Sequence, residues 1–182
     1  MSATTTKKVK IATVWLDGCS GCHMSFLDMD QRLLDVAPLI ELVYSPLVDR
    51  KEFPPDVDVT LVEGSVSTDE DVPKIKKIRA NTKILIALGD CAVTGNVPAM
   101  RNNFSLKEVL DRGYVDNVTM NPGPPTKLIP MLEPKVVPLH EVVPVDLFIP
   151  GCPPSADLIY FVLSEVLAGR IPDLTNKARF GN

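Results

Sequence analysis

Five short apolar segments rich in Val, Ile and Leu occur along the sequence, each bounded by turn residues. They are Lys10–Leu16, Ile40–Tyr44, Val57–Val62, Lys83–Leu88 and Val145–Ile149. Segments with helical spacing of apolar residues lie between or after them, at Met24–Val36, Glu70–Ala80, Leu106–Asp111 and Ala156–Ala168. The pattern therefore predicts five strands that alternate with helices.

Strands that alternate with helices indicate a parallel sheet covered by helices on both faces. Runs such as "KILIALG" support this, because a strand buried on both faces shows no polar alternation. We expect an α/β, flavodoxin-like doubly wound sheet in a single domain over residues 1–182, with residues 1–8 as a frayed tail.

A proline-rich segment, residues 115–144, does not fit a minimal sheet of this kind. It contains seven prolines: Pro122, Pro124, Pro125, Pro130, Pro134, Pro138 and Pro144. Because proline removes amide donors and breaks helices, we expect a long, irregular excursion over the surface. Two interpretations stand side by side, a rigid loop packed on its own domain and a docking surface.

The composition is that of an ordinary soluble globular protein, with 45% hydrophobic and 23% charged residues and a net charge of −4. A nucleic-acid partner is not expected, since phosphates require a basic face. No apolar segment approaches the roughly 20 residues that span a bilayer, so we expect a cytoplasmic chain without a transmembrane segment. In a reducing compartment, four cysteines indicate metal ligation or redox chemistry rather than disulfides.

The four cysteines all follow predicted strands. Cys19 and Cys22 follow the first strand in "WLDGCSGC", Cys91 follows the fourth in "ALGDCAVTG" and Cys152 follows the fifth in "FIPGCPPS". The carboxyl ends of parallel strands share one edge, where ligands bind. We therefore expect the thiols to meet there, although Cys91 and Cys152 could instead be small buried apolar residues.

The residues around the cysteines favour a cofactor with negative charge. Glycines allow close backbone approach to cluster sulfurs, and helices that begin after Cys22 and Cys152 direct their N-termini at that charge. His23 could hydrogen-bond a sulfur, or it could be a solvent-facing or packing histidine. The residues expected around the cluster are Gly18, Ser20, Gly21, His23, Gly89, Gly95, Gly151 and Pro153.

Other uses of these cysteines fit less well. The string "CSGCH" matches the attachment site of c-type haem, but no second axial ligand is indicated. A dithiol oxidoreductase would leave Cys91 and Cys152 without a role, and structural zinc usually takes two paired knuckles. A [4Fe–4S] cluster held by Cys19, Cys22, Cys91 and Cys152 fits best.

Four motifs in order, "WLDGCSGCHMSFL", "VEGSV", "LGDCAVTGNVP" and "VVPVDLFIPGCPPSADLI", resemble the electron-transferring small subunits of [NiFe] hydrogenases and their relative in respiratory complex I. The resemblance covers essentially the whole chain. It implies the same four cysteine ligands. The complex I relative has an adjacent Cys-Cys pair in the first motif, so the Cys-x-x-Cys of this chain favours hydrogenase.

The resemblance also implies a function as part of an oxidoreductase. With no cysteine after Cys152, the chain looks like the small subunit of the cytoplasmic, bidirectional NAD-reducing [NiFe] hydrogenase. It would carry one relay cluster and no catalytic residue, between a hydrogen-cleaving large subunit and a diaphorase with iron–sulfur and flavin subunits. The alternatives are a complex I-like cluster subunit and a flavodoxin-like FMN-binding module, although no motif supports FMN.

Glu63 lies in the "VEGSV" motif, just after the third predicted strand and on the same predicted edge as the cysteines. It could line a partner interface or a proton path. The simpler interpretation is an exposed loop carboxylate.

Overall fold

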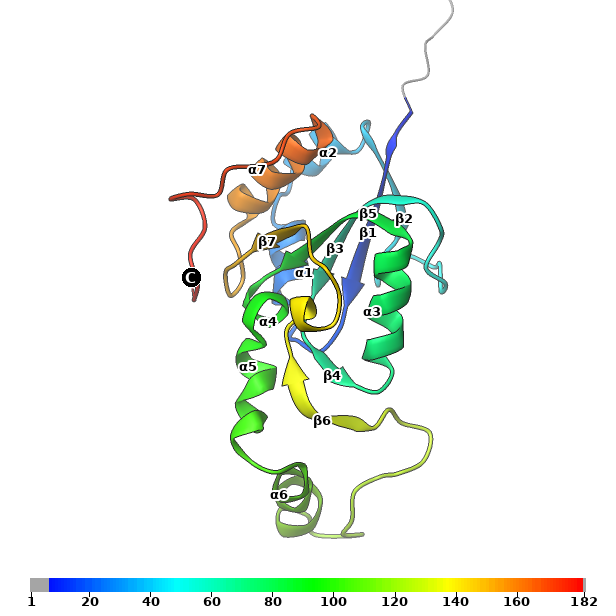
Figure 1. Ribbon diagram of the computed structural model, residues 1–182, viewed down its shortest axis with the longest axis vertical. Helices are drawn as coiled ribbons and strands as arrows, with labels where there is room; N and C mark the ends of the chain where they lie inside the picture. The colour runs from blue at the N-terminus through cyan, green and yellow to red at the C-terminus, as the bar shows by residue number, and fades with distance from the viewer. Residues whose placement is uncertain (1–6, 182) are drawn as a thin grey trace, which may run out of the picture.

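The computed structural model describes residues 7–181, and its centre is a five-stranded, fully parallel sheet (Figure 1). The strand order is β2-β1-β3-β5-β7, which is the flavodoxin-like order expected from the sequence. The strands are β1 (Val9–Trp15), β2 (Ile40–Tyr44), β3 (Val57–Glu63), β5 (Thr82–Leu88) and β7 (Leu147–Ile149). All five predicted strands are therefore present.

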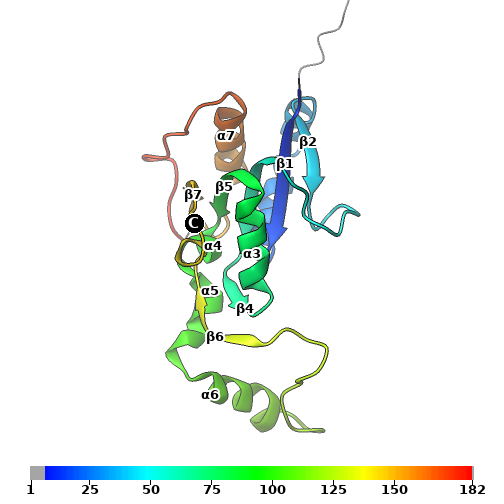
Figure 2. The ribbon, with the colours of Figure 1, turned by 45° about the vertical axis from the view of Figure 1, so that its right-hand side comes forward.

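Helices cover both faces of the sheet. Helices α1 (Gly21–Leu27), α2 (Arg32–Val36) and α7 (Ala156–Leu167) pack on one face, and α3 (Asp71–Ala80) packs on the other (Figures 1 and 2). Alternate residues of one strand serve the two cores: Leu61 of β3 is buried beneath α7, and Val62 is buried beneath α3. This two-sided burial explains why the strands read as unbroken apolar runs.

The helix predicted over Met24–Val36 is wrong as a single element. The structure has α1 and α2, separated by a turn in which Asp30 takes a positive φ of 54°. A left-handed residue cannot continue a right-handed helix, and aspartate tolerates that conformation better than most residues. The other three predicted helices are present, and α6 keeps its predicted bounds, Leu106–Asp111.

A small lobe extends beyond the carboxyl edge of the sheet (Figure 2). It contains α6, a π-helical turn (Arg112–Asp116) and the strand β6 (Leu132–Val137), which pairs antiparallel with β4 (Val66–Thr68). Two short helices, α4 (Asp90–Thr94) and α5 (Asn96–Ala99), and a 3₁₀ turn (Met100–Asn103) lead from β5 to the lobe.

The sequence led us to expect an irregular proline-rich segment, but only part of it is irregular. It includes β6 and a 3₁₀ turn at Leu139–Glu141. Pro134 lies inside β6, which is tolerated because that strand lies at the edge of a two-stranded sheet. Residues 115 and 116 belong to the π-helical turn, and residues 117–131 form an irregular loop that leads to β6.

The frayed tail predicted for residues 1–8 lies mostly outside the described residues. Of that range, only residues 7 and 8 are described, and neither belongs to a strand or helix. Within residues 7–181, no helix has both the length and the apolar character needed to cross a membrane.

Candidate functional site

The site lies where four neighbouring strands end at one edge of the sheet. Trp15, Glu63 and Leu88 are in register across β1, β3 and β5, and Leu88 pairs with Ile149 of β7. The segments that leave β1, β5 and β7 carry the four cysteines and are called the first, second and third cysteine loops, with Cys22 already in α1 and Cys91 in α4. The parallel register thus places three distant sequence segments side by side, as the sequence predicted.

The cysteines are unpaired and differ in exposure. Cys22 is buried, Cys91 is half-buried, and Cys19 and Cys152 are exposed. Burial raises the pKa of Cys22 well above its ordinary value, and the negative charges of Glu63, Cys91, Cys19 and Cys152 raise it further. Direct contacts join the cysteine segments: the backbone of Gly89, two residues before Cys91, lies against Cys22 Sγ, and Asn96, five residues after Cys91, donates to Cys152 Sγ.

Gly89 makes the contact between the first and second cysteine loops. It has a φ of +82°, and a Cβ atom built on it would lie 2.2 Å from Cys22 Sγ. No side chain can occupy that space, so the backbone before Cys91 lies directly against the Cys22 sulfur. Gly89 is one of the residues predicted from sequence to surround a cluster, and the structure places it in contact with Cys22 Sγ.

Two donors at the start of α5 point at sulfur atoms. Asn96 donates from Nδ2 to Cys152 Sγ at 3.4 Å. Burial raises the pKa of Cys91, and hydrogen bonds from the Val97 amide and the Asn96 side chain oppose that rise. Donors of this kind stabilise negative charge on sulfur. The sequence reasoning did not identify Asn96 or Val97, because α5 was not predicted.

His23 and Glu63 form a buried pair beneath the first cysteine loop. Oε2 of Glu63 accepts from the His23 backbone amide at 3.0 Å and lies 2.5 Å from the ring Nδ1. The His23 ring also meets the Trp15 ring edge to face, with centroids 5.2 Å apart. Glu63 is only 2% exposed, so its interpretation as an exposed loop carboxylate is wrong, and it does not line the surface of this chain.

His23 lies in the first turn of α1, as expected, and is a buried packing residue rather than a solvent-facing one. Its Nε2 atom and the Trp15 Nε1 atom are both buried without a hydrogen-bond partner among the described residues. The structure therefore shows no bond from the His23 ring to a cysteine sulfur. Trp15 was missed as a residue of the site.

The other residues predicted around the site each lie within four residues of a cysteine. Ser20 has a φ of 65° directly before α1, and a Cβ on Gly21 would lie 3.2 Å from Cys19 Sγ. Gly18 lies against Gly64 and Glu63. The remaining residues are Gly95 between α4 and α5, Gly151 before Cys152, and Pro153, which follows Cys152 through a cis peptide bond.

The four thiols are not arranged like the ligands of one ion. Within residues 7–181, no three His, Cys, Asp or Glu side chains are grouped so as to hold a single metal ion. In a [4Fe–4S] cluster each thiolate binds a different iron atom, so the ligands stand further apart than around one ion. The set of four neighbouring, unpaired thiols with amide donors suits such a cluster.

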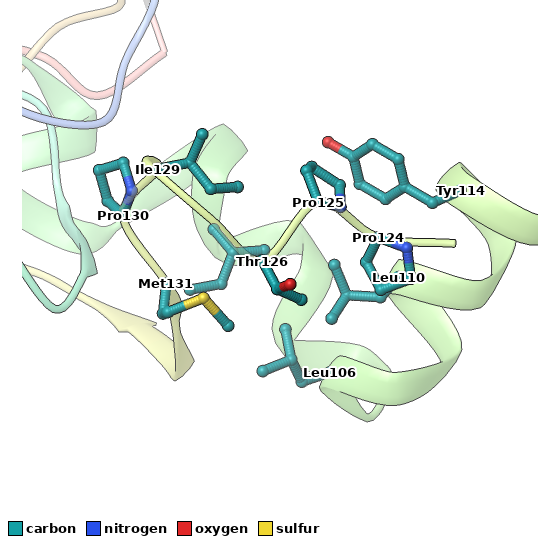
Figure 3. Close-up of a pocket in the computed structure, with 10 residues that line it drawn as sticks. Leu106, Leu110, Tyr114, Pro124, Pro125, Thr126, Ile129, Pro130 and Met131 are labelled. Carbon is teal, nitrogen blue, oxygen red and sulfur yellow. The ribbon is translucent and has the colours of Figure 1, made fainter. Parts of the chain in front are cut away.

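An apolar pocket lies in the lobe, and no cysteine lines it (Figure 3). Leu106 and Leu110 of α6 and Tyr114 of the π-helical turn form one side, and the proline-rich loop, with Pro125 and Ile129, forms the other (Figure 3). Several large apolar side chains in and around the lobe are exposed: Val97, Met100, Phe104, Tyr114, Met120, Leu128, Ile129 and Met131. Exposed apolar side chains are common at interaction surfaces.

Comparison with known proteins shows the family. The family described as NADH ubiquinone oxidoreductase, 20 Kd subunit, matches residues 19–166. The delta subunit of the NAD-reducing hydrogenase HoxS of Cupriavidus necator is 46% identical over 172 residues, which cover 92% of this chain and 82% of that protein. A subunit of the F420-non-reducing hydrogenase of Methanocaldococcus jannaschii is 41% identical and matches 94% of this chain, which spans 60% of that protein.

Solved structures agree with these similarities. A chain in the crystal structure of an NAD⁺-reducing [NiFe]-hydrogenase in the H2-reduced state superposes with a TM-score of 0.87 and 40% identity, covering 92% of this chain and 95% of that chain. A chain of the [NiFeSe] hydrogenase of Desulfovibrio vulgaris Hildenborough shares the fold, with a TM-score of 0.60 and 18% identity, covering 92% of this chain and 62% of that one. The resemblance to hydrogenase small subunits expected from the motifs is thereby confirmed.

Proposed function

We propose, since this chain belongs to the family of the NADH–ubiquinone oxidoreductase 20 kDa subunit, that it is the electron-transfer subunit of an NAD-linked [NiFe] hydrogenase. The observation that carries the proposal is that the segments with the four unpaired thiols leave the carboxyl edge of the sheet side by side and contact one another. Cys19, Cys22, Cys91 and Cys152 would hold one [4Fe–4S] cluster, which when bound accepts and donates single electrons.

The chain's own residues would supply the environment of the cluster. Burial at Cys22 and the amide donors of Asn96 and Val97 set how well negative charge is tolerated on the sulfurs. Gly89 leaves room for Cys22 to approach the second cysteine loop. The buried His23–Glu63 pair ties the start of α1 to the end of β3, so that the first loop keeps one orientation.

The partners would dock at the same end of the molecule. Cys19 and Cys152 are exposed at the edge of the sheet, and the apolar side chains of the lobe are exposed beyond that edge. Electron transfer requires the cluster to lie close to the groups with which it exchanges electrons. A large subunit that cleaves hydrogen and a diaphorase that reduces NAD, in the cytoplasm, are the partners that this proposal requires.

Anaerobic purification of the chain, with its partners and alone, tests the proposal. About four iron and four sulfide per chain are expected, together with an EPR signal of a reduced [4Fe–4S] cluster. Cys152→Ser should lower iron content and hydrogen-dependent NAD reduction together. Bound zinc without iron would overturn the proposal. Oxidoreductase activity that survives the double change Cys91→Ser and Cys152→Ser would indicate a dithiol enzyme instead.

A further inference from the structure

Asp90 is a buried carboxylate that the proposed function leaves without a role. It is the first residue of α4, directly before Cys91, and only 5% of it is exposed. Aspartate is seldom buried unless its oxygens are hydrogen-bonded, because burying an unpaired charge is costly. The residues predicted from sequence to form the site include its neighbours Gly89 and Cys91 but not Asp90.

Two hydrogen bonds join Asp90 to Gly151, the residue directly before Cys152. The Gly151 amide donates to Asp90 Oδ1 at 2.6 Å, and the Asp90 amide donates to the Gly151 carbonyl at 2.9 Å. One residue earlier, Gly89 donates to Ile149 across β5 and β7 at 2.8 Å. The hydrogen-bond pairing of β5 with β7 thus continues beyond the strand ends, to the residues directly before Cys91 and Cys152. At its last position the Asp90 side chain is the acceptor in place of a backbone carbonyl.

The second carboxylate oxygen binds a third segment. The Gly181 amide donates to Asp90 Oδ2 at 2.8 Å, although 91 residues separate the two positions. The segment after α7 turns back along that helix (Figure 1), where Lys177 Nζ lies 4.5 Å from the centre of the Phe161 ring, and it ends with the Gly181 amide at Asp90 of α4. Both oxygens of Asp90 are therefore occupied by amides from distant parts of the chain.

We infer that Asp90 is a positioning residue, whose carboxylate holds the Cys91 and Cys152 loops against each other and anchors the segment after α7 to them. The inference rests on the proposed function, because the spacing of these two loops matters for cluster binding. Asparagine cannot replace aspartate, since its amide nitrogen would face one of the two glycine amides. Hydrogen bonds to a charged carboxylate are also stronger than hydrogen bonds to the neutral amide oxygen of asparagine.

Asp71 provides a matched control for Asp90. It too is the first residue of a helix, α3, and its Oδ2 accepts from the backbone amides of Ser67 and Thr68 at 3.1 and 2.9 Å. No cysteine lies in that loop. A change to asparagine removes the carboxylate charge at both positions. At position 71 the remaining amide oxygen can still accept from both backbone amides, whereas at position 90 one of the two glycine amides loses its acceptor, and only position 90 is beside the thiols.

The test compares Asp90→Asn, Asp71→Asn and the unchanged chain, residues 1–182. In the metal-free protein, amide hydrogen exchange at Gly151 or Gly181 should become at least about tenfold faster in Asp90→Asn only, the effect of losing one charged hydrogen bond. In the iron-loaded protein, Asp90→Asn should lower the iron content and alter the EPR g values, and Asp71→Asn should leave both unchanged. If Asp90→Asn does not fold, Asp90→Glu, which keeps the charge but displaces the oxygens, takes its place with the same expectations.

Unchanged exchange together with normal iron content in the Asp90 variant would overturn the inference, and so would equal losses in both variants. A different result separates the two proposals. If the unchanged chain binds no iron, the proposed function fails, and the exchange rates at Gly151 and Gly181 alone decide whether Asp90 couples the three segments.

Discussion

Glu63 at the end of β3 contacts His23 at the start of α1. Its Oε2 atom accepts a hydrogen bond from the His23 backbone amide at 3.0 Å and lies 2.5 Å from the His23 ring Nδ1. Both residues are almost fully buried. A single carboxylate oxygen thus fixes the helix that carries Cys22 to the centre of the sheet. The pair connects the core of the fold with the loop that holds half of the thiols.

Replacement of Glu63 should therefore destabilise the protein. Glu63→Ala leaves the buried His23 amide and ring without an acceptor and should lower the free energy of unfolding by roughly 2 kcal/mol. Glu63→Gln keeps the size and one acceptor oxygen, so its effect should be smaller. Urea denaturation of the metal-free chain measures both, and an alanine variant as stable as the unchanged protein would contradict the role given to this pair.

Gly89→Ala should disturb the site more than other glycine changes. The new methyl group would overlap Cys22 Sγ, and the positive φ adds backbone strain, so a loss of about 2 kcal/mol or more and reduced iron content are expected. Gly169→Ala is the matched control, because Gly169 also has a positive φ, of +73°, and a Cβ there meets no atom within 4 Å. Thermal unfolding and iron analysis of both variants check the prediction. Equal behaviour of the two would show that Cys22 can move aside.

Asn96→Ala should make the cluster harder to reduce. Loss of the Nδ2 donor to Cys152 removes a bond that stabilises negative charge on sulfur. If that bond is worth about 1 kcal/mol, the midpoint potential should fall by about 40 mV. Asn103→Ala, which removes only a bond to the Met100 carbonyl, should leave the potential unchanged in the same redox titration. An unchanged potential in Asn96→Ala would rule out this tuning.

Asp58 should contribute stability that is lost in acid. Burial raises the pKa of its carboxyl, but hydrogen bonds from Lys83 and the Lys10 amide outweigh burial and hold the pKa below its ordinary value. A group whose pKa is lower in the folded state stabilises the fold above its unfolded pKa of about 4. Asp58→Asn should thus cost about 1 kcal/mol at neutral pH, and the cost should shrink as the pH falls below about 4. Denaturation at several pH values tests this, and a pH-independent difference would contradict it.

The exposed apolar side chains of the lobe should matter for assembly. Leu128→Asp should weaken binding to the large subunit, because Leu128 is fully exposed beside the apolar pocket of the lobe. Ile171→Asp is the control, since Ile171 is 91% exposed but lies near Lys83 at the opposite end of the sheet. Co-purification with the large subunit compares them. Loss of binding with Ile171→Asp alone would place the interface elsewhere.

The sequence by itself determined the strands, the parallel sheet and the placement of the cysteine loops. Buried strands need continuous apolar runs, and parallel strands put all their carboxyl ends at one edge, so both follow from local pattern and simple topology. The split of the helix after β1 was not predicted, because a single residue, Asp30, sets it through a left-handed conformation.

Only the tertiary structure decided which side chains surround the thiols. Glu63, Asp90 and Asn96 meet their partners across 40, 61 and 56 positions of the sequence, respectively. Nothing near each residue in the chain reveals such a contact, and a carboxylate at a strand end is most often exposed. Pairing of a buried charge depends on the register of neighbouring strands, which becomes visible only when the chain is folded.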